Sequence, residues 1–513
     1  MTAGLSGTMS FGRRLGMLAD AHPDQTAIIF VRSEGEEQRL SWRALERASN
    51  QLARLLAAQG ADQGSIVAVG LPNCPEHFIS TFAVWKLGAL PLSLRSAMPD
   101  RERDAVLDLA QPAAVVADWT GTKYPTLRPS DLSSLEAHDD GPLPDRISNP
   151  GKAIPSGGST GRPKIIVTPG PWARVPGTPV GILDALGFGM QQMQLVCAPL
   201  YHNGPFVTSY HGLFDDDTLV VMERFDAARA VELIERYRIA VMYLPPILMQ
   251  RIAALPGVRD RDFSSIQAVA STAAPVPVWL KRFWIDLVGA RAVTEIFGAT
   301  EFVGFTVIRG DEWLSHPGSV GRPFVTDIRI LDEGGMPLPP GEVGEIFMRR
   351  NPPVGETYYY LGSPPATSTP DGFISVGDLG WVDEEGYLFI ADRRVDMINS
   401  GGANVYPAEV EAALSEHPGV GDVVVIGVPD PEWGKRVHAV VQPGDPTHPP
   451  AVQELDAWAR ERIASYKVPK TYEFVADFPR SDTGKIQCSA LAAARESGWT
   501  EGMVRAREGR SLT

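Results

Sequence analysis

Apolar residues in the first third of the chain follow helical and strand spacing in turn. Leucine and alanine residues three or four positions apart share one face between Ser41 and Gly60, which predicts a helix capped by Ser41. The short continuous apolar runs at residues 66–69 and 113–116 are typical of buried strands. An amphipathic helix is expected around residues 78–87. This alternation predicts an α/β fold with mostly parallel, helix-covered sheets.

The same alternation resumes after residue 190 and places small or polar residues behind the strands. Strands are expected at residues 195–198, 240–244, 266–270 and 292–297, with a helix at 228–237. The clusters that follow three of these strands are residues 199–204, 271–275 and 298–301. Because open α/β sheets bind ligands at the carboxyl ends of their strands, we expect the clusters to form one shared site.

Beyond residue 320 the pattern changes twice. Short strands separated by Gly, Pro and Asp turns predict a small β-rich subdomain at about residues 320–390. After residue 392, two helices and two strands predict a compact α+β unit. We therefore expect a large N-terminal domain at residues 1–394, a smaller and mobile C-terminal domain at residues 395–513, and a hinge near residues 393–396.

The length, charge and cysteine content of the chain argue against several classes of function. The 513 residues exceed the reach of one core, and the net charge of −15 argues against broad binding to nucleic acids or anionic membranes. No apolar run approaches the ~18 residues of a membrane-spanning helix, and no signal peptide is expected. Three cysteines without metal-ligand spacing suit the reducing cytoplasm. The oligomeric state stays open.

Residues 156–164 read Ser-Gly-Gly-Ser-Thr-Gly-Arg-Pro-Lys and form the strongest candidate for a binding loop. Glycines let backbone amides converge on phosphate oxygens, while hydroxyl groups and Lys164 add donors and positive charge. A Walker A loop would need Gly-Lys-Ser/Thr opening a helix, and a flexible Gly/Ser linker would not need a lysine with a strand directly behind it. The expected phosphate-binding residues are Ser156, Gly157, Gly158, Ser159, Thr160, Gly161 and Lys164.

This loop resembles the phosphate loop of the adenylate-forming superfamily, which includes acyl-CoA synthetases, luciferases and adenylation domains. The family usually has Gly after the lysine, where this chain has Ile165. Further motifs extend the resemblance from about Ser41 to Lys485, with most likeness to bile-acid and aryl-acid CoA ligases. The resemblance implies ATP and Mg²⁺ as cofactors.

The segment Phe297-Gly298-Ala299-Thr300-Glu301 resembles the aromatic-Gly-x-Thr-Glu motif of that family. The resemblance implies that Phe297 lies by the adenine, that Thr300 contacts the α-phosphate and that Glu301 helps to hold Mg²⁺. A single carboxylate suits this metal, which prefers phosphate oxygens and water to a full protein cage. Taken alone, the segment also fits an ordinary turn after a strand.

Other motifs complete the nucleotide site by resemblance. The adenine-side segment is Thr272, Ala273, Ala274 and Pro275, in which Thr272 and Ala273 replace glycines usual in the family. The ribose contacts are Asp378 and Arg393. Taken alone, Asp378 also suits a turn between glycines, but a carboxylate can accept both ribose hydroxyl groups.

The resemblance also assigns residues to the C-terminal domain. Lys485 would bridge the substrate carboxylate and the α-phosphate, and Gly401 and Gly402 would line the path of the acceptor. Val395 stands at the hinge position, where relatives usually carry Asp or Lys. A solvated turn lysine is the alternative for Lys485.

The acid pocket is expected from strand ends and by resemblance. Its residues are Tyr201, His202, Tyr243, Thr272 and Phe302, with His202 as a gate beside the acid carboxylate. A lone histidine is often a structural residue, which is the alternative. No aspartate lies between residues 199 and 206 to pair an α-ammonium group, so an acid without one is favoured. The Asp215-Asp216-Asp217 run fits a solvated turn.

The implied function is activation of a carboxylic acid as acyl-AMP, followed by transfer to the thiol of CoA. The runner-up keeps the first step and transfers the acyl group to an amine, forming an amide. A nucleotide-binding regulator without catalysis is a third alternative, but such a protein would need neither Lys485 nor Glu301. The identity of the acid is not readable from the sequence.

Overall fold

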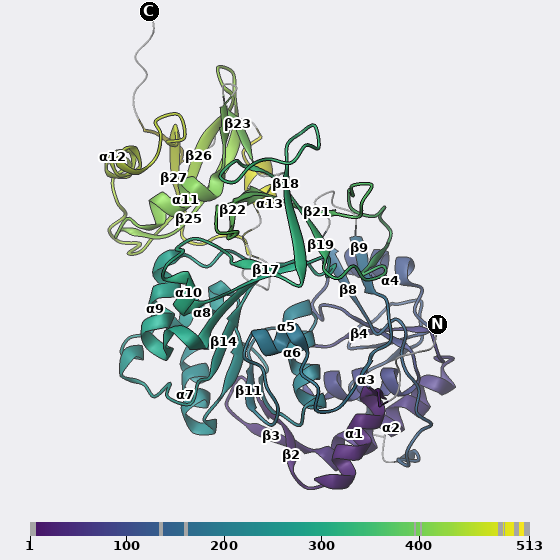
Figure 1. The fold of residues 1–513 in the computed structure, drawn as a ribbon. Helices are drawn as coiled ribbons and strands as arrows, with labels where there is room; N and C mark the ends of the chain where they lie inside the picture. The colour runs from purple at the N-terminus through teal and green to yellow at the C-terminus, as the bar shows by residue number, and fades with distance from the viewer. Residues whose placement is uncertain are drawn as a thin grey trace, which may run out of the picture.

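The computed structural model describes residues 7–132, 137–157, 163–393, 397–400, 403–480, 486, 488–496 and 502–506. Its elements form two large sheets, a small antiparallel sheet and a C-terminal sheet with its own helices. Figure 1 shows the C-terminal elements gathered at one end of the molecule, next to the small sheet, with the two large sheets and their helices making up the rest. The expected α/β class, with a large N-terminal and a small C-terminal domain, is confirmed.

The first large sheet has seven strands, and the two strands that flank the predicted phosphate loop lie near one of its edges. Its central strands are parallel, whereas β9 and β20 are antiparallel to their neighbours. In spatial order the strands are β20 (Tyr359–Leu361), β9 (Pro163–Thr168), β8 (Lys152–Gly157), β5 (Leu90–Ser93), β4 (Ile66–Gly70), β6 (Ala114–Ala117) and β7 (Thr126–Leu127). The loop at residues 158–162 therefore joins two paired antiparallel strands, as the apolar flanks of the loop predict.

The second large sheet has nine strands, and the six adjacent strands in its middle run parallel to one another. In spatial order they are β17 (Arg322–Phe324), β16 (Phe305–Arg309), β15 (Val293–Gly298), β14 (Ala268–Ser271), β13 (Val241–Tyr243), β11 (Met193–Val196), β12 (Thr218–Met222), β2 (Thr26–Val31) and β3 (Glu37–Ser41). The antiparallel strands β16, β17 and β3 lie at the two edges. The parallel sheet expected from the alternation is thus confirmed.

Helices cover both large sheets in layers. One apolar core lies between the sheets and includes residues of α1, α2, α3 and α6, while α7, α8 and α9 cover the far face of the nine-stranded sheet and α4 that of the seven-stranded sheet. The helices are α1 (Phe11–Ala21), α2 (Trp42–Ala58), α3 (Pro75–Lys86), α4 (Asp100–Ala110), α5 (Gly181–Ala185), α6 (Asn203–Phe214), α7 (Ala227–Tyr237), α8 (Pro246–Ala253), α9 (Val278–Val288) and α10 (Gly310–Trp313). The short strands β1 (Met9–Ser10) and β10 (Ala173–Arg174) pair with each other.

The remaining sheets are smaller. An antiparallel sheet forms the expected β-rich region from β18 (Thr326–Leu331), β19 (Gly344–Arg350), β21 (Ile374–Val382) and β22 (Leu388–Arg393). The C-terminal part contains β23 (Ile398–Ser400), β24 (Ala403–Val405), β25 (Val420–Asp430), β26 (Gly434–Pro443), β27 (Thr471–Phe474) and β28 (Val504–Arg505), with α11 (Pro407–Ser415), α12 (Val452–Arg462) and α13 (Cys488–Ala493). Its apolar core is separate from those of the N-terminal domain.

The structure confirms the predicted cap of one helix and corrects the predicted exposure of another. Helix α2 has the expected cap, because the Ser41 hydroxyl accepts a hydrogen bond from the Ala44 backbone amide at 3.2 Å. The prediction that helix α3 is amphipathic is wrong, because eleven of its twelve residues are buried. It lies in the core between the two sheets, so even His77 and Thr81 of this helix are enclosed. Among the described residues, no helix is both long and apolar enough to cross a bilayer.

The fold contains a buried ion pair that gives a test of the packing behind the candidate site. Lys281 Nζ of α9 lies 2.6 Å from Glu295 Oε2 of β15, and both side chains are almost fully enclosed. We expect Glu295→Ala to destabilise the protein by about 3–5 kcal/mol, because it leaves the Lys281 ammonium buried without its partner. Thermal unfolding measures this loss.

The exposed pair Lys123–Asp108, at 2.8 Å, provides the matched control. Asp108→Ala should leave the melting temperature nearly unchanged, because solvent screens exposed pairs. A Glu295→Ala variant that melts like the wild type would contradict the buried-pair interpretation.

Candidate active site

Three segments meet at the carboxylate of Glu301. Lys164 Nζ of β9 lies 3.5 Å from Glu301 Oε1, and the Tyr360 hydroxyl of β20 donates a 2.6 Å hydrogen bond to the same oxygen. The Lys164 ammonium also lies 4.1 Å from the centre of the Tyr360 ring. The structure therefore brings the lysine that ends the phosphate loop together with the glutamate that follows β15, although they are far apart in the chain.

The contact leaves part of the Glu301 carboxylate available. Both contacts fall on Oε1, and no hydrogen bond within the described ranges involves Oε2. Burial, followed by the nearby Glu301 charge, raises the pKa of the Tyr360 hydroxyl, so this group stays a hydrogen-bond donor. One carboxylate oxygen is thus oriented by the protein, while the other accepts no hydrogen bond from the described residues.

Glu301 lies in a turn of an antiparallel hairpin. Strands β15 and β16 pair from Thr294 with Arg309 to Gly298 with Phe305, so residues 299–304 connect them. A Cβ atom on Gly298 would lie 2.5 Å from the Phe305 ring, which explains why a glycine fits at the start of the turn. Phe302 has a positive φ of 56°, which is uncommon for a residue with a side chain. The turn that presents Thr300 and Glu301 is therefore tight, and its backbone is strained at Phe302.

The start of α6 forms a second wall. The rings of Tyr201 and His202 lie 4.5 Å apart just before the helix, and Tyr243 comes from the end of β13. A Cβ atom on Gly204 would lie 2.5 Å from the Tyr243 ring, so only glycine permits this approach. The structure thus brings the start of α6 against Tyr243, one of the residues that the sequence predicts to line the acid pocket.

Lys152 is a residue of this region that sequence reasoning missed. It begins β8, the strand that leads into the phosphate loop, and its ammonium donates a 2.5 Å hydrogen bond to Asn203 Oδ1 at the start of α6. The same ammonium lies 4.8 Å from the centre of the Phe302 ring. The available signal was the lysine at the start of a short apolar strand. Such strands are normally buried, so a charged residue in one of them is unusual.

The adenine-side segment follows β14. Ser271 ends that strand, and Ala273 adopts a positive φ of 80°. Glycine takes this conformation without strain and alanine does not, so the alanine in place of a usual glycine carries backbone strain here. Ala273 and Pro275 are exposed, whereas Thr272 and Ala274 are half-buried.

The ribose-side residues lie side by side in the small antiparallel sheet. Asp378 of β21 is directly opposite Arg393 of β22 in the strand pairing. This register brings the two motif positions together in the fold. The Asp378 side chain is half-buried, and a nearby β-bulge at Leu379 and Gly380 interrupts the ladder.

Several sequence-predicted residues lie outside the described residues. They are Gly158, Ser159, Thr160 and Gly161 of the phosphate loop, Val395 of the hinge, Gly401 and Gly402 of the acceptor path, and Lys485. For Ser156, Gly157 and Arg393 the structure gives the backbone in β8 and β22.

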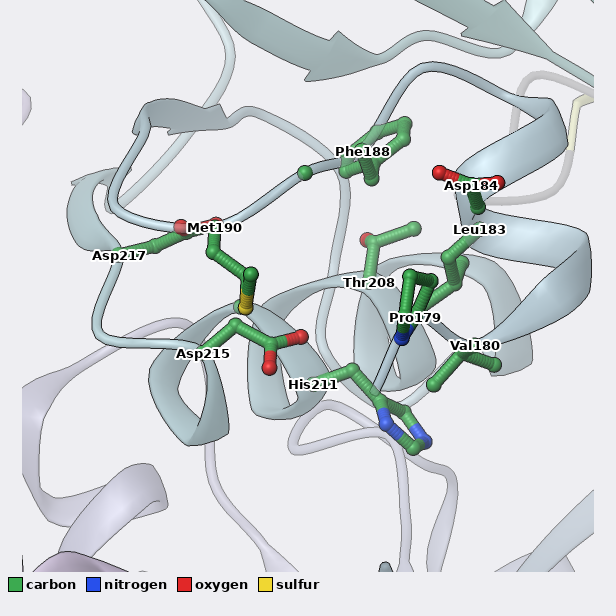
Figure 2. Close-up of a pocket in the computed structure, with 12 residues that line it drawn as sticks. Pro179, Val180, Leu183, Asp184, Phe188, Met190, Thr208, His211, Asp215 and Asp217 are labelled. Carbon is green, nitrogen blue, oxygen red and sulfur yellow. The ribbon is translucent and has the colours of Figure 1, made fainter. Parts of the chain in front are cut away.

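A cavity of about 140 Å³ lies beside the C-terminal half of α6. Figure 2 shows His211 and Asp215 on the helix side of this cavity, with Leu183, Phe188 and Met190 from the segment before β11 around it. None of the residues predicted for the acid pocket lines this cavity. It is therefore a space separate from the wall formed by Tyr201, His202 and Tyr243.

The aspartate run beside the cavity corrects a prediction. The expected solvated turn at Asp215–Asp217 is wrong, because the side chains of Asp215 and Asp216 are largely enclosed and Asp217 is only 1% exposed. Arg174 lies 2.7 Å from Asp215, and the Gln192 backbone amide donates a 2.8 Å hydrogen bond to Asp217. The end of α6 and the following strand β12 turn these carboxylates inward, which the local sequence does not show.

The chain matches two family models. The first, described as AMP-binding enzyme, covers residues 17–359, and the second, described as AMP-binding enzyme C-terminal domain, covers residues 409–485. The chain belongs to the AMP-binding enzyme family. The resemblance drawn from the phosphate loop is thereby confirmed, and the two matched ranges fall on the two parts of the fold.

Known relatives of this AMP-binding enzyme share most of its length. A feruloyl-CoA synthase from an Amycolatopsis species is 35% identical over 462 residues, which is 87% of this chain and 92% of the relative. An o-succinylbenzoate CoA synthetase from Bacillus subtilis, solved with its acyl-adenylate intermediate, has a TM-score of 0.79 at 25% identity and covers 94% of this chain and 98% of its own. An amide bond synthetase from Marinactinospora thermotolerans has a TM-score of 0.77 at 24% identity and covers 94% and 99%. At this identity the last similarity shows the fold alone.

The buried carboxyl of Asp217 gives this AMP-binding enzyme a testable pH dependence. Burial raises the pKa of Asp217 to about 8, and Asp215 and Asp216 add to the rise, so the folded protein holds a proton that the unfolded chain releases near pH 4. The stability contribution of Asp217 is therefore full below about pH 4 and is lost as the pH rises toward 8. We expect Asp217→Asn to gain stability relative to the wild type over this range, by up to about 1.4 kcal/mol per pH unit.

Thermal unfolding at pH 5, 6, 7 and 8 measures the difference. The exposed Asp262, whose hydrogen bonds with Ser264 lower its pKa, is the control. Asp262→Asn should differ from the wild type by a constant amount from pH 5 to 8, because Asp262 is already ionised there. A constant difference for Asp217→Asn as well would show that Asp217 does not hold a proton.

Proposed function

We propose that this AMP-binding enzyme activates a carboxylic acid with MgATP and transfers the acyl group to the thiol of CoA. In the first step a carboxylate oxygen forms a bond to the α-phosphorus while the bond to the bridging oxygen breaks, so pyrophosphate leaves and acyl-AMP remains. In the second step the CoA sulfur forms a bond to the acyl carbon, its proton is released and AMP leaves. The observation that carries the proposal is the contact of Lys164 with Glu301.

That contact combines the two kinds of group that a bound nucleotide needs. Lys164 supplies positive charge for the phosphates next to the glycine-rich loop, whose members are Ser156 to Gly161. Glu301 would hold Mg²⁺ together with phosphate oxygens and water. Thr300 is assigned to the α-phosphate. Mg²⁺ would neutralise charge on the phosphates and help orient them for the attack.

The remaining nucleotide roles follow the positions in the fold. Phe297, Gly298 and Ala299, with Ala273, Ala274 and Pro275, are assigned to the adenine side, since both segments end neighbouring strands β15 and β14. Asp378 and Arg393 are assigned to the ribose, which their direct pairing across β21 and β22 supports. These groups come from two sheets, so one nucleotide would bridge them.

The acid is assigned to the wall that starts at α6. Tyr201, His202, Tyr243, Thr272 and Phe302 would line its pocket, and His202 would lie beside the carboxylate. The relative named feruloyl-CoA synthase makes an aryl acid the first candidate to test.

The C-terminal domain is assigned to both half-reactions. We place the boundary at residues 393–396, with Val395 as the hinge, the N-terminal domain before it and a mobile domain at residues 395–513. Lys485 would stabilise the first transition state, and rotation about the hinge would replace it by the Gly401-Gly402 face that admits the acceptor. We infer a cytoplasmic location, where ATP and CoA are available.

CoA is preferred over an amine as the acceptor. The relatives at 28–35% identity are named as CoA ligases for several acids, or as a ligase for acyl-carrier protein, and each of these acceptors presents a thiol. The amide synthetase resembles this chain at the level of the fold, which both acceptor types share. An amine remains the alternative acceptor that the experiment has to separate.

The deciding experiment supplies purified enzyme with MgATP and one acid from a panel of ferulate, benzoate, 2-succinylbenzoate and decanoate. Acid-dependent exchange of labelled pyrophosphate into ATP tests adenylation, and AMP release with CoA or with a panel of amines tests transfer. We expect exchange with at least one acid and acceleration of AMP release by CoA. Acceleration by amines alone would overturn the acceptor, and absence of exchange with every acid would overturn the proposed activation step.

Lys485 gives a separate prediction for the first half-reaction. Lys485→Ala should reduce pyrophosphate exchange by about 10²–10³-fold, the usual effect of removing a charge-stabilising donor from a transition state. Acyl transfer from supplied acyl-AMP to CoA should stay near the wild-type rate, because the lysine is not needed there. Lys467→Ala, a lysine of the same domain that pairs with Glu409, is the control and should change neither rate. Equal losses in both half-reactions would contradict the role of Lys485.

A further inference from the structure

Three lysines in the described part of the chain are buried, and two of them have carboxylate partners. Lys86 Nζ lies 2.5 Å from Glu46 Oε2, and Lys281 Nζ lies 2.6 Å from Glu295 Oε2. A charged group removed from water normally needs such a partner, because desolvation otherwise costs more than the fold regains. From these two ion pairs, the third buried lysine would be expected to have a carboxylate partner as well.

Lys152 does not follow this pattern. It is 1% exposed, yet no carboxylate of the described residues lies within 4 Å of its ammonium. Its contacts are the amide oxygen of Asn203 at 2.5 Å and the face of Phe302 at 4.8 Å, which compensate a full positive charge only in part. Burial lowers the pKa of Lys152 to about 7, and the more distant charge of Glu301 opposes this shift. In the described part of the chain, the charged form of this buried amine therefore has no carboxylate partner.

The position of Lys152 indicates which anion is missing. Lys152 begins β8, which leads into the phosphate loop, while Asn203 directly follows His202 and Phe302 directly follows Glu301. The ammonium therefore lies where the proposed acid wall approaches the proposed phosphate site. Adenylation requires that a carboxylate oxygen reach the α-phosphorus, and this is the place where the two ligands would meet.

We propose that the ammonium of Lys152 binds the carboxylate of the acid substrate and holds it against the α-phosphate of ATP. This assignment rests on the proposed function and adds a binding residue to it. The substrate supplies the counter-charge that Glu46 and Glu295 supply to the other two buried lysines. Once the acyl-AMP bond has formed, the acyl group carries no carboxylate charge, so the contact weakens before transfer.

The contacts favour the acid over the phosphates as the ligand of Lys152. Lys164, not Lys152, contacts Glu301 and Tyr360 on the side that leads out of the phosphate loop. Lys152 instead contacts Asn203 and Phe302, which flank the residues assigned to the acid and the turn. The two lysines would therefore divide the anions of the reaction, Lys164 for ATP and Lys152 for the acid.

The test uses Lys152→Met, which keeps the length and removes the charge, and Lys152→Gln, which keeps a hydrogen-bond donor for Asn203. Each full-length variant receives MgATP and the acid of the panel ferulate, benzoate and decanoate that gives the fastest pyrophosphate exchange in the wild type. We expect KM for the acid to rise on the order of 10–10²-fold in both variants, the effect of losing a hydrogen bond to a charged group. KM for ATP should stay within about twofold, since Lys164 remains.

Transfer from supplied acyl-AMP to CoA provides the internal control, because acyl-AMP carries no free carboxylate. We expect this rate to be unchanged in both variants, which would also show that they are folded. The double variant Lys281→Met/Glu295→Gln removes the charge of another buried lysine and the charge of its carboxylate partner. This variant should leave KM for the acid unchanged.

The outcomes separate the alternatives. A folded Lys152→Met enzyme with the wild-type KM for the acid would overturn the assignment while leaving the proposed function intact. A rise in KM for ATP or pyrophosphate without a rise for the acid would make a phosphate the ligand of Lys152, which also overturns it. Absence of acid-dependent exchange in the wild type would instead contradict the proposed function itself, and the assignment with it.

Discussion

The contact of Lys164 and Tyr360 with Glu301 is the interaction on which the candidate site depends. Lys164 and Tyr360 belong to the seven-stranded sheet, whereas Glu301 belongs to a hairpin of the nine-stranded sheet. The carboxylate thus joins the edges of both sheets at the phosphate loop. Because the sheets pack on a shared core of α1, α2, α3 and α6, the rigid interior fixes the distance between these edges.

Buried charge is arranged differently in the scaffold and at the site. The Lys86–Glu46 and Lys281–Glu295 pairs are complete within the protein, so they hold the helices without needing a ligand. Lys152 is equally enclosed, but its partner is an amide and an aromatic ring. A buried charge without a counter-charge lowers the stability of a protein. Such a charge is expected at a binding site, where the ligand supplies the counter-charge, because binding sites commonly lose stability in exchange for function. The strained φ of Phe302 and Ala273 belongs to the same region.

The architecture also explains how a single site can serve two half-reactions. The nucleotide-side groups come from strand ends and turns of the N-terminal domain, and the small antiparallel sheet places Asp378 and Arg393 directly before the C-terminal part. The C-terminal sheet has a core of its own, which is what a domain that rotates as a unit would need. The chemistry assigned to Lys485 and to Gly401-Gly402 requires such independence.

The sequence by itself determined the α/β class, the strand that carries Lys164 and the family, because periodicity and short glycine-rich motifs depend on local backbone geometry. It also predicted the helix cap at Ser41 and the shared edge of residues 298–301 and 271–275. Only the tertiary structure showed that α3 is enclosed on all sides, that Asp215–Asp217 turn inward and that Lys152 is buried without a carboxylate partner among the described residues. These facts depend on which segments pack together from distant parts of the chain, and a local pattern of polar and apolar residues does not contain that information.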